Sequence, residues 1–289
     1  MNLTVVLGAL ELGGIFAIMS LGLYISYKIL NLPDLTVDGS FTLGCAVSAV
    51  FTIHSMPYLG LILAFVIGCI AGIVTGLLIT KLNIMPLLSG ILTMTGLYSI
   101  NLRIMGDAPN ISLFESSSVF TPLEFLAPYD KIIVIGMIVL LVCLFLHYFL
   151  RTQLGLALRA CGDNEDMVRA SSIDTDKMKI LGLALANGFV SLGGAVYAQH
   201  QTFSDIASGT GMMVIGLASI IVGMTIIKKD KIGFQLFAVV FGAVFYRAIL
   251  TIALQLGLPS GDLKLLSAVL VVIAIASASF KRKRRRSKC

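Results

Sequence analysis

The stretch YLGLILAFVIGCIAGIVTGLLIT, residues 58–80, contains no charged side chain. A helix rises about 1.5 Å per residue, so a run of this length covers the roughly 30 Å of a bilayer's hydrocarbon core. Similar apolar runs recur along the chain, which predicts several helices that cross a membrane. Within this run Gly68, Gly72 and Gly76 repeat at four-residue spacing. We expect a neighbouring helix to pack closely against them.

The composition supports a membrane protein. Of the 289 residues, 57% are hydrophobic and only 12% are charged. Soluble domains carry about twice that charged share, because their surfaces must face water. We therefore expect an all-α, polytopic membrane protein. Residues 1–280 form its single membrane domain, and residues 281–289 form a basic tail.

The apolar runs predict about nine membrane helices. The expected ranges are 3–27, 39–54, 58–80, 86–104, 131–150, 178–198, 211–227, 233–256 and 262–279. Two of them, 39–54 and 211–227, are short for a full crossing. We therefore expect a broken or re-entrant segment, placed after the first helix. The first run has no basic residue ahead of it and is interrupted by Glu11, so we expect it to be retained as a helix rather than removed as a signal peptide.

The basic residues predict the orientation. Loops on the cytoplasmic side carry an excess of lysine and arginine. With the tail KRKRRRSKC inside, nine crossings place Lys28, Lys81, the segment 151–177 and KKDK (228–231) on the same side. The basic residues that do not follow this rule are Arg103, Lys131, Arg247 and Lys264. We therefore expect the amino terminus outside and the carboxyl terminus in the cytoplasm, with the tail anchored by anionic lipid rather than by nucleic acid. Residues 105–130, with four acids and no bases, form an extracellular loop.

The stretch NLPDLTVDGSF, residues 31–41, is the first candidate for a functional site. Pro33 and Gly39 can break a helix, and two carboxylates lie between apolar runs. One interpretation is a helix break beside a translocation pathway, with Asn31 and Asp34 in polar contacts and Asp38 capping the next helix. The other is a simple turn at the inner membrane face, in which Asp38 caps and Asp34 is solvated. Both remain open from the residues alone.

Other polar residues fall inside expected membrane helices. Ionisable side chains at this depth are costly unless they face water or a partner, so Glu11 and Arg247 are candidates for a pathway. A structural ion pair or a bond to backbone is an equal alternative for both. Asn187 is a further pathway candidate, although with Ser191 and Gln199 it belongs to a set that more often joins helices to one another.

Motifs for catalysis are missing from the sequence. It has no G-x-x-x-x-G-K-[ST] for nucleotide phosphates, no H-E-x-x-H and no G-x-S-x-G. The three histidines are far apart, and the spacing of the five cysteines suits neither a zinc site nor a set of disulfides. We therefore expect no enzyme, no metal site and no cofactor held by this chain.

The segment 151–177 predicts a short helix on the cytoplasmic side. In GDNEDMVRASSID, Asn164 can cap a helix that follows Asp163, and acidic side chains favour a helix's first turn. Its exposed apolar residues would suit a partner's groove. A solvated loop is the alternative. The residues expected to couple to a partner are Asp163, Asn164, Glu165, Asp166, Met167, Val168 and Arg169.

The stretch LGLALRACGDNEDMVRASSIDTDKMKILGLALANGFVSLGGAVYAQ (154–199) resembles permease subunits of ABC importers for branched-chain amino acids and ribose. Ser191 to Ala195 match the family's "AGxAG" run, and GLASIIVGMTII (216–227) resembles its late "A-x-x-x-G" helix. The positions Asn31, Gly39, Gly44 and Ala46 match an early family pattern loosely. DLTVDGSFTLG is closer to a subgroup of uncharacterised bacterial permeases, some of them associated with aromatic amino acids. SSID stands where the family usually has "xGI", a departure in the turn of the coupling segment.

The resemblance implies a multi-pass protein of the bacterial cytoplasmic membrane. It implies a second copy of the chain, two cytoplasmic ATPase subunits that hold ATP and Mg²⁺, and an external solute-binding lipoprotein. The solute would be small and amino acid-like, and the resemblance to the subgroup suggests an aromatic one. Two other functions remain open: a secondary transporter coupled to ions through Asp34, Glu11 and Arg247, and a membrane scaffold without transport.

Overall fold

The computed structural model describes residues 3–114, 116–122, 129–229 and 231–257, together with 259, 262, 265–269 and 272. The chain is largely helical, as expected. Its elements are α1 (Leu3–Tyr24), η1 (Ile25–Ile29), α2 (Thr36–Ile53), α3 (Pro57–Thr80), α4 (Pro86–Ile104), β1 (Asn110–Ser112), α5 (Asp130–Phe149), α6 (Gln153–Asp163), α7 (Glu165–Ala170), α8 (Thr175–Gln201), β2 (Phe203–Asp205), α9 (Met212–Ile226) and α10 (Ile232–Gln255).

Six helices in the described residues are long and apolar enough to cross a membrane. They are Thr4–Ile29, Thr36–Ile53, Pro57–Thr80, Asp130–Phe149, Thr175–Gln201 and Ile232–Gln255. The expected spans 86–104 and 211–227 also form helices, but α4 carries several polar side chains and α9 is short. The expected span 262–279 lies largely outside the described residues. The tail 281–289 lies wholly outside them. So do two of the four acidic residues of the loop 105–130, Glu115 and Glu124.

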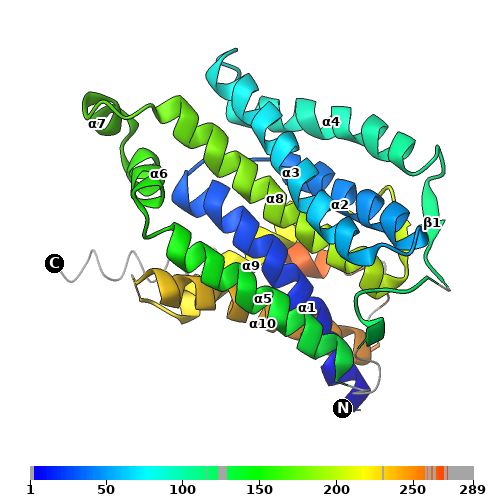
Figure 1. Ribbon diagram of the computed structural model, residues 1–289. Helices are drawn as coiled ribbons and strands as arrows, with labels where there is room; N and C mark the ends of the chain where they lie inside the picture. The colour runs from blue at the N-terminus through cyan, green and yellow to red at the C-terminus, as the bar shows by residue number, and fades with distance from the viewer. Residues whose placement is uncertain are drawn as a thin grey trace.

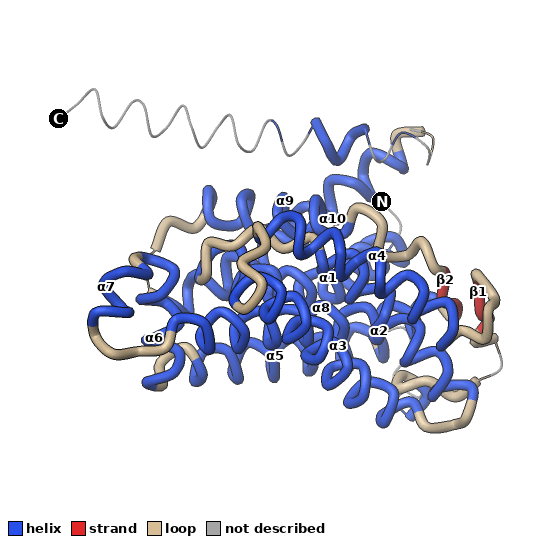
Figure 2. The backbone as a smooth tube through the Cα atoms, turned by 90° about the horizontal axis from the view of Figure 1, so that it is seen from above, coloured by secondary structure: helices blue, strands red, loops and turns tan. Residues whose placement is uncertain are grey.

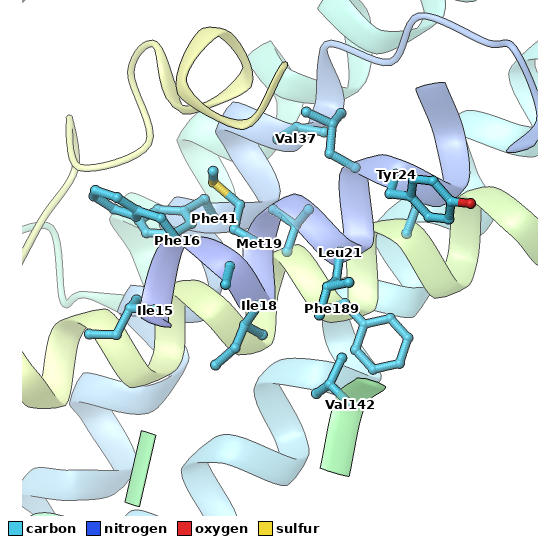
Figure 3. Packing of buried hydrophobic residues seen from close by; sticks show 14 of the residues in the cluster. Ile15, Phe16, Ile18, Met19, Leu21, Tyr24, Val37, Phe41, Val142 and Phe189 are labelled. Carbon is cyan, nitrogen blue, oxygen red and sulfur yellow. The ribbon is translucent and has the colours of Figure 1, made fainter. Parts of the chain in front are cut away.

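Helix α8 forms the centre of the bundle. It packs against α1, α2 and α3, while α10 lies along α1 and α9. Figure 1 shows α8 and α1 inside the bundle, with α4 along one edge. Figure 3 shows the core around α1, where Ile18 and Leu21 lie near Phe189 of α8 and Val142 of α5.

The two ends of the bundle differ. Helices α6 and α7 lie at one end, and the strands β1 and β2 lie at the other (Figure 2). The strands form an antiparallel pair that joins the loop after α4 to the loop after α8. The described segments that are richest in lysine and arginine also lie at the α7 end.

The glycine repeat of α3 faces α8, as the sequence predicts. A Cβ added to Gly72 would lie 2.2 Å from the backbone oxygen of Leu183. No side chain fits at that distance, so the two backbones approach as closely as helices in membranes do at small residues. The repeat therefore fixes the packing of α3 against the central helix.

Candidate functional site

The chain breaks its helix after α1. The last turn of that helix is the π-helix η1, and Asn31 adopts a left-handed conformation with φ of 56°. A non-helical segment that contains Pro33 then leads to α2, which begins at Thr36. The expected start of this helix at residue 39 is wrong by three residues. Asp38, which was expected before the helix, lies in its first turn. The helix is interrupted between η1 and α2, and a re-entrant segment at this place stays a prediction.

The break returns into the bundle. Asp34 contacts Asn187, which is near the middle of α8, while Leu35 lies against Gly90 in the second turn of α4. Non-helical backbone inside a membrane protein is tolerated only where protein or a cavity covers it. The depth of the break in the membrane stays a prediction.

Asp34 is held in a closed polar network. Its Oδ2 accepts a hydrogen bond from Nδ2 of Asn187 at 2.7 Å, and its Oδ1 accepts one from the backbone N–H of Thr36 at 2.9 Å. Ser40 donates to Oδ1 of Asn187 at 2.7 Å. Asp34 is 1% exposed and Asn187 is fully buried. The solvated turn is therefore wrong for Asp34, and a pathway role for Asp34 and Asn187 stays a prediction.

The other polar residues of α8 join helices, as expected of such a set. Ser191 donates to the backbone oxygen of Ala64 on α3 at 2.7 Å. Gln199 donates to Oγ of Ser48 on α2 at 2.9 Å. These bonds tie α2 and α3 to the central helix.

Asp38 does not cap the start of its own helix. Its Oδ2 accepts a hydrogen bond from the backbone N–H of Gly211 at 2.9 Å, and its Oδ1 accepts one from Met213 at 2.8 Å. These groups open α9, so the expectation of a cap on α2 is wrong. A carboxylate at this place satisfies the free N–H groups and the positive end of the α9 dipole.

A cavity of about 320 Å³ lies beside Asp38. It is bounded by α2, α4 and the segment that precedes α9. Its lining residues are Asp38, Gly39, Thr42, Met94, Thr95, Tyr98, Asn101, Ile206, Gly209 and Thr210. Asp38 is the one residue of the six pathway candidates that lines it. The size is at the lower end of the range for small-molecule sites.

Sequence reasoning missed the contribution of α4 to this cavity. Its polar residues Thr95, Tyr98 and Asn101 follow one another at helical spacing on a face that looks toward Gly39 and the segment 206–210. The signal was available as an unusually polar helix among apolar ones.

The remaining pathway candidates lie elsewhere. Glu11 of α1 pairs with His200 of α8, Oε2 to Nε2 at 2.8 Å. The guanidinium carbon of Arg247 lies 5.6 Å from the ring centroid of Phe16, and no ion pair to Arg247 is present among the described residues. Asn31 is exposed at the break. The structure thus brings together Asp34 and Asn187 and leaves Glu11, Arg247 and Asn31 apart from them.

The expected short helix is present as α7. Oδ1 of Asn164 accepts a hydrogen bond from the backbone N–H of Met167 at 3.1 Å, as a helix cap does. Asp163 is the last residue of α6, a helix that the sequence did not predict. Met167 is 70% exposed, whereas Val168 is buried against the bundle. The expected apolar patch is therefore narrower than the sequence indicated.

Glu165 fastens α7 to the start of α8. Its Oε2 lies 2.7 Å from Nζ of Lys179, and its Oε1 accepts a bond from Arg169 at 3.0 Å. The hydrogen bond from Lys179 is the main reason that the pKa of Glu165 lies below its ordinary value. Gly162, at the end of α6, has no room for a side chain against the backbone oxygen of Ile29 in η1. The α6–α7 unit is therefore attached both to α8 and to the π-helical turn of α1.

Known proteins resemble this chain over most of its length. A family model described as "Branched-chain amino acid transport system / permease component" matches residues 5–276. A "Tyrosine transport system permease protein" of Clostridioides difficile is 41% identical over 260 residues, which cover 89% of this chain and 86% of that one.

Two further relatives widen this set. "Uncharacterized protein RP368" of Rickettsia prowazekii is 34% identical over 281 residues, covering 94% of this chain and 97% of that one. The "Ribose import permease protein RbsC" of Escherichia coli is 25% identical over 206 residues, covering 68% and 62%. No solved structure matches the chain. The chain belongs to the family of permease components of branched-chain amino acid transport systems, which confirms the resemblance seen in its sequence.

Proposed function

We propose that this chain forms the translocation pathway of an ABC importer for an amino acid-like solute, with the cavity at Asp38 as part of that pathway. The observation that carries the proposal is a cavity that holds one carboxylate, at the level where α2 and α9 both begin. Transporters commonly build their sites near the midplane from helices that begin or end there. Membership of the permease family supplies the class of transport.

The partners follow from the family. A separate ATPase, which holds ATP and Mg²⁺, drives transport from the cytoplasm, and an external binding protein delivers the solute. A second copy of the chain completes the pathway. The described residues include a short exposed helix, α7, that suits a groove in the ATPase. A relative named for tyrosine transport supports an aromatic amino acid as solute.

The orientation is part of the same proposal. The α7 end faces the cytoplasm of a bacterium, with the tail 281–289 on that side, and the β1–β2 end faces outward toward the binding protein. Helices α4 and α9 lie within the membrane beside the six more apolar spans, and the segment before α9 re-enters the bundle as far as Asp38. The excess of basic residues at the α7 end supports this orientation.

The ion-coupled alternative is weaker on structural grounds. Its three coupling candidates do not share a site: Asp34 is bonded to Asn187, and Glu11 is paired with His200. Arg247 lies against Phe16 instead of either carboxylate.

Co-purification tests the proposal. The tagged chain is expressed in its own organism, where its ATPase would be present, and is isolated in mild detergent. We expect the ATPase to be retained in stoichiometric amounts. Isolation of the folded chain without it, under conditions that retain the ATPase of a known importer, would contradict the proposal.

A further inference from the structure

The cavity at Asp38 offers hydrogen-bond acceptors and a negative charge. Asp38 carries the only charge among its described lining residues. A carboxylate has about four acceptor sites, and the backbone groups of Gly211 and Met213 occupy two of them. The carboxylate therefore keeps capacity to accept hydrogen bonds from a ligand.

Asn101 of α4 provides a second acceptor in the lining. Its Nδ2 donates to the backbone oxygen of Gly39 at 3.2 Å, which fixes the orientation of the amide. Its Oδ1 is buried and has no hydrogen-bond partner among the described residues. Asn101 as a whole is 1% exposed. A buried acceptor without a donor is unfavourable, so an N–H donor that entered the cavity would be stabilised there.

The rest of the lining suits the body of an aromatic or other apolar ligand. Tyr98 and Met94 of α4 supply an aromatic ring and a thioether, and Tyr98 is 55% exposed. A cation above such a ring is attracted by its face. The set of groups is therefore complementary to a ligand with an ammonium group and an apolar body.

We propose that this cavity binds the ammonium group of the transported solute, with Asp38 and Asn101 as its acceptors. The inference rests on the proposed function and names the group of the solute that the pathway recognises. An ethanolamine lipid carries the same ammonium, but its headgroup also carries a negatively charged phosphate, which a cavity with the Asp38 carboxylate disfavours. Liposomes of phosphatidylcholine, which has no N–H donor, separate the two sources.

A tryptophan placed in the cavity reports on binding. The sequence contains no tryptophan, so the full chain with Tyr98→Trp has a single fluorophore. In phosphatidylcholine liposomes we expect its emission to titrate with phenethylamine and with L-phenylalanine. It does not titrate with 3-phenylpropanoate, which has the same ring without the ammonium. Leu88→Trp, on α4 outside the cavity lining, is the control for partition of the probes into the membrane. Thr95→Trp is a second reporter if Tyr98→Trp fails to fold.

Variants of Asn101 complete the test. In the reporter background, Asn101→Leu weakens phenethylamine binding about tenfold, because a hydrogen bond to a charged group is lost. Asn101→Asp keeps an acceptor and restores the binding. Equal titration by 3-phenylpropanoate, no titration by the two amines, or unchanged affinity in Asn101→Leu would each overturn the ammonium site. If one of these results overturns the ammonium site, retention of the ATPase on co-purification still supports the proposed function. Loss of the ATPase would contradict the proposed function and the ammonium site together.

Discussion

Nδ2 of Asn187 donates a hydrogen bond to Oδ2 of Asp34 at 2.7 Å, and this bond joins the middle of α8 to the break between η1 and α2. The sequence separation of 153 residues makes it a tertiary contact of the whole bundle. Both side chains are almost completely buried. The bond therefore holds the non-helical segment in place against the central helix.

Replacing Asn187 with leucine is expected to destabilise the protein. The variant keeps a side chain of similar size but leaves Oδ2 of Asp34 buried without its donor. Such a loss costs about 1–3 kcal/mol, and more when the group is charged. Thermal unfolding in detergent measures it, with Ser99→Leu on the exposed face of α4 as the control. Equal melting temperatures for the two variants would show that the bond contributes nothing.

Gly72→Ala is expected to loosen α3 from α8. The added methyl group would lie 2.2 Å from the backbone oxygen of Leu183, so the helices must separate. Overpacking of this kind costs about 1–3 kcal/mol. Gly136→Ala on α5 is the matched control, because nothing lies within 4 Å of its added methyl group. Melting temperatures in detergent compare the two, and a fall for Gly136→Ala as large as that for Gly72→Ala would refute the close contact.

The attachment of α7 is expected to weaken in acid. The pKa of Glu165 is lowered in the folded protein, chiefly by the bond from Lys179. Because the pKa of Glu165 is lower in the folded protein than its value of 4.5 in the unfolded chain, the ionised carboxylate stabilises the fold at pH values above 4.5. This stabilisation is lost as the pH falls through the pKa of the folded state. Hydrogen exchange of the amides of 164–174 measures the attachment at pH values on both sides of 4.5.

Glu165→Gln provides the comparison. The amide does not titrate, so the protection of these amides, corrected for the intrinsic pH dependence of exchange, should already be reduced at neutral pH and should not fall further as the pH drops below 4.5. A pH dependence identical to that of the unchanged protein would assign the effect to another group.

Met167→Asp is expected to weaken retention of the ATPase. Met167 is the most exposed apolar side chain of α7, and docking of this helix would bury it. A charge at a buried position of an interface is unfavourable. Ala170→Ser, a small change at another exposed position of the same helix, is the control. The amount of ATPase that co-purifies measures the effect, and equal retention in both variants would place the contact elsewhere.

The sequence predicted the membrane helices better than the site. The ranges 58–80, 86–104 and 131–150 agree with α3, α4 and α5 to within one residue at each end. The first two begin at or next to a proline, which suits the first turn of a helix, and 58–80 and 131–150 are strongly apolar runs. Helix α6 was missed within a polar interval, although its Thr152 cap and its apolar Leu158 and Cys161 at helical spacing were readable.

The contacts of the two aspartates could not be predicted. Asp38 bonds to Gly211 across 173 residues, and no local pattern gives that pairing. The nearness of Lys28 suggested the cytoplasmic face for the break, whereas the return of the chain toward Asn187 carries Asp34 to the middle of α8. Tertiary contacts thus determine that Asp34 is buried and that Asp38 lines a cavity.

Solute uptake by the assembled importer tests the central claim most directly. The chain, its ATPase and its binding protein are reconstituted in liposomes, with ATP on the ATPase side and labelled L-tyrosine as the probe. The account predicts uptake that requires ATP, the binding protein and this chain together, and that persists when ion gradients are abolished. Uptake that continues without ATP but stops on collapse of an ion gradient would contradict it.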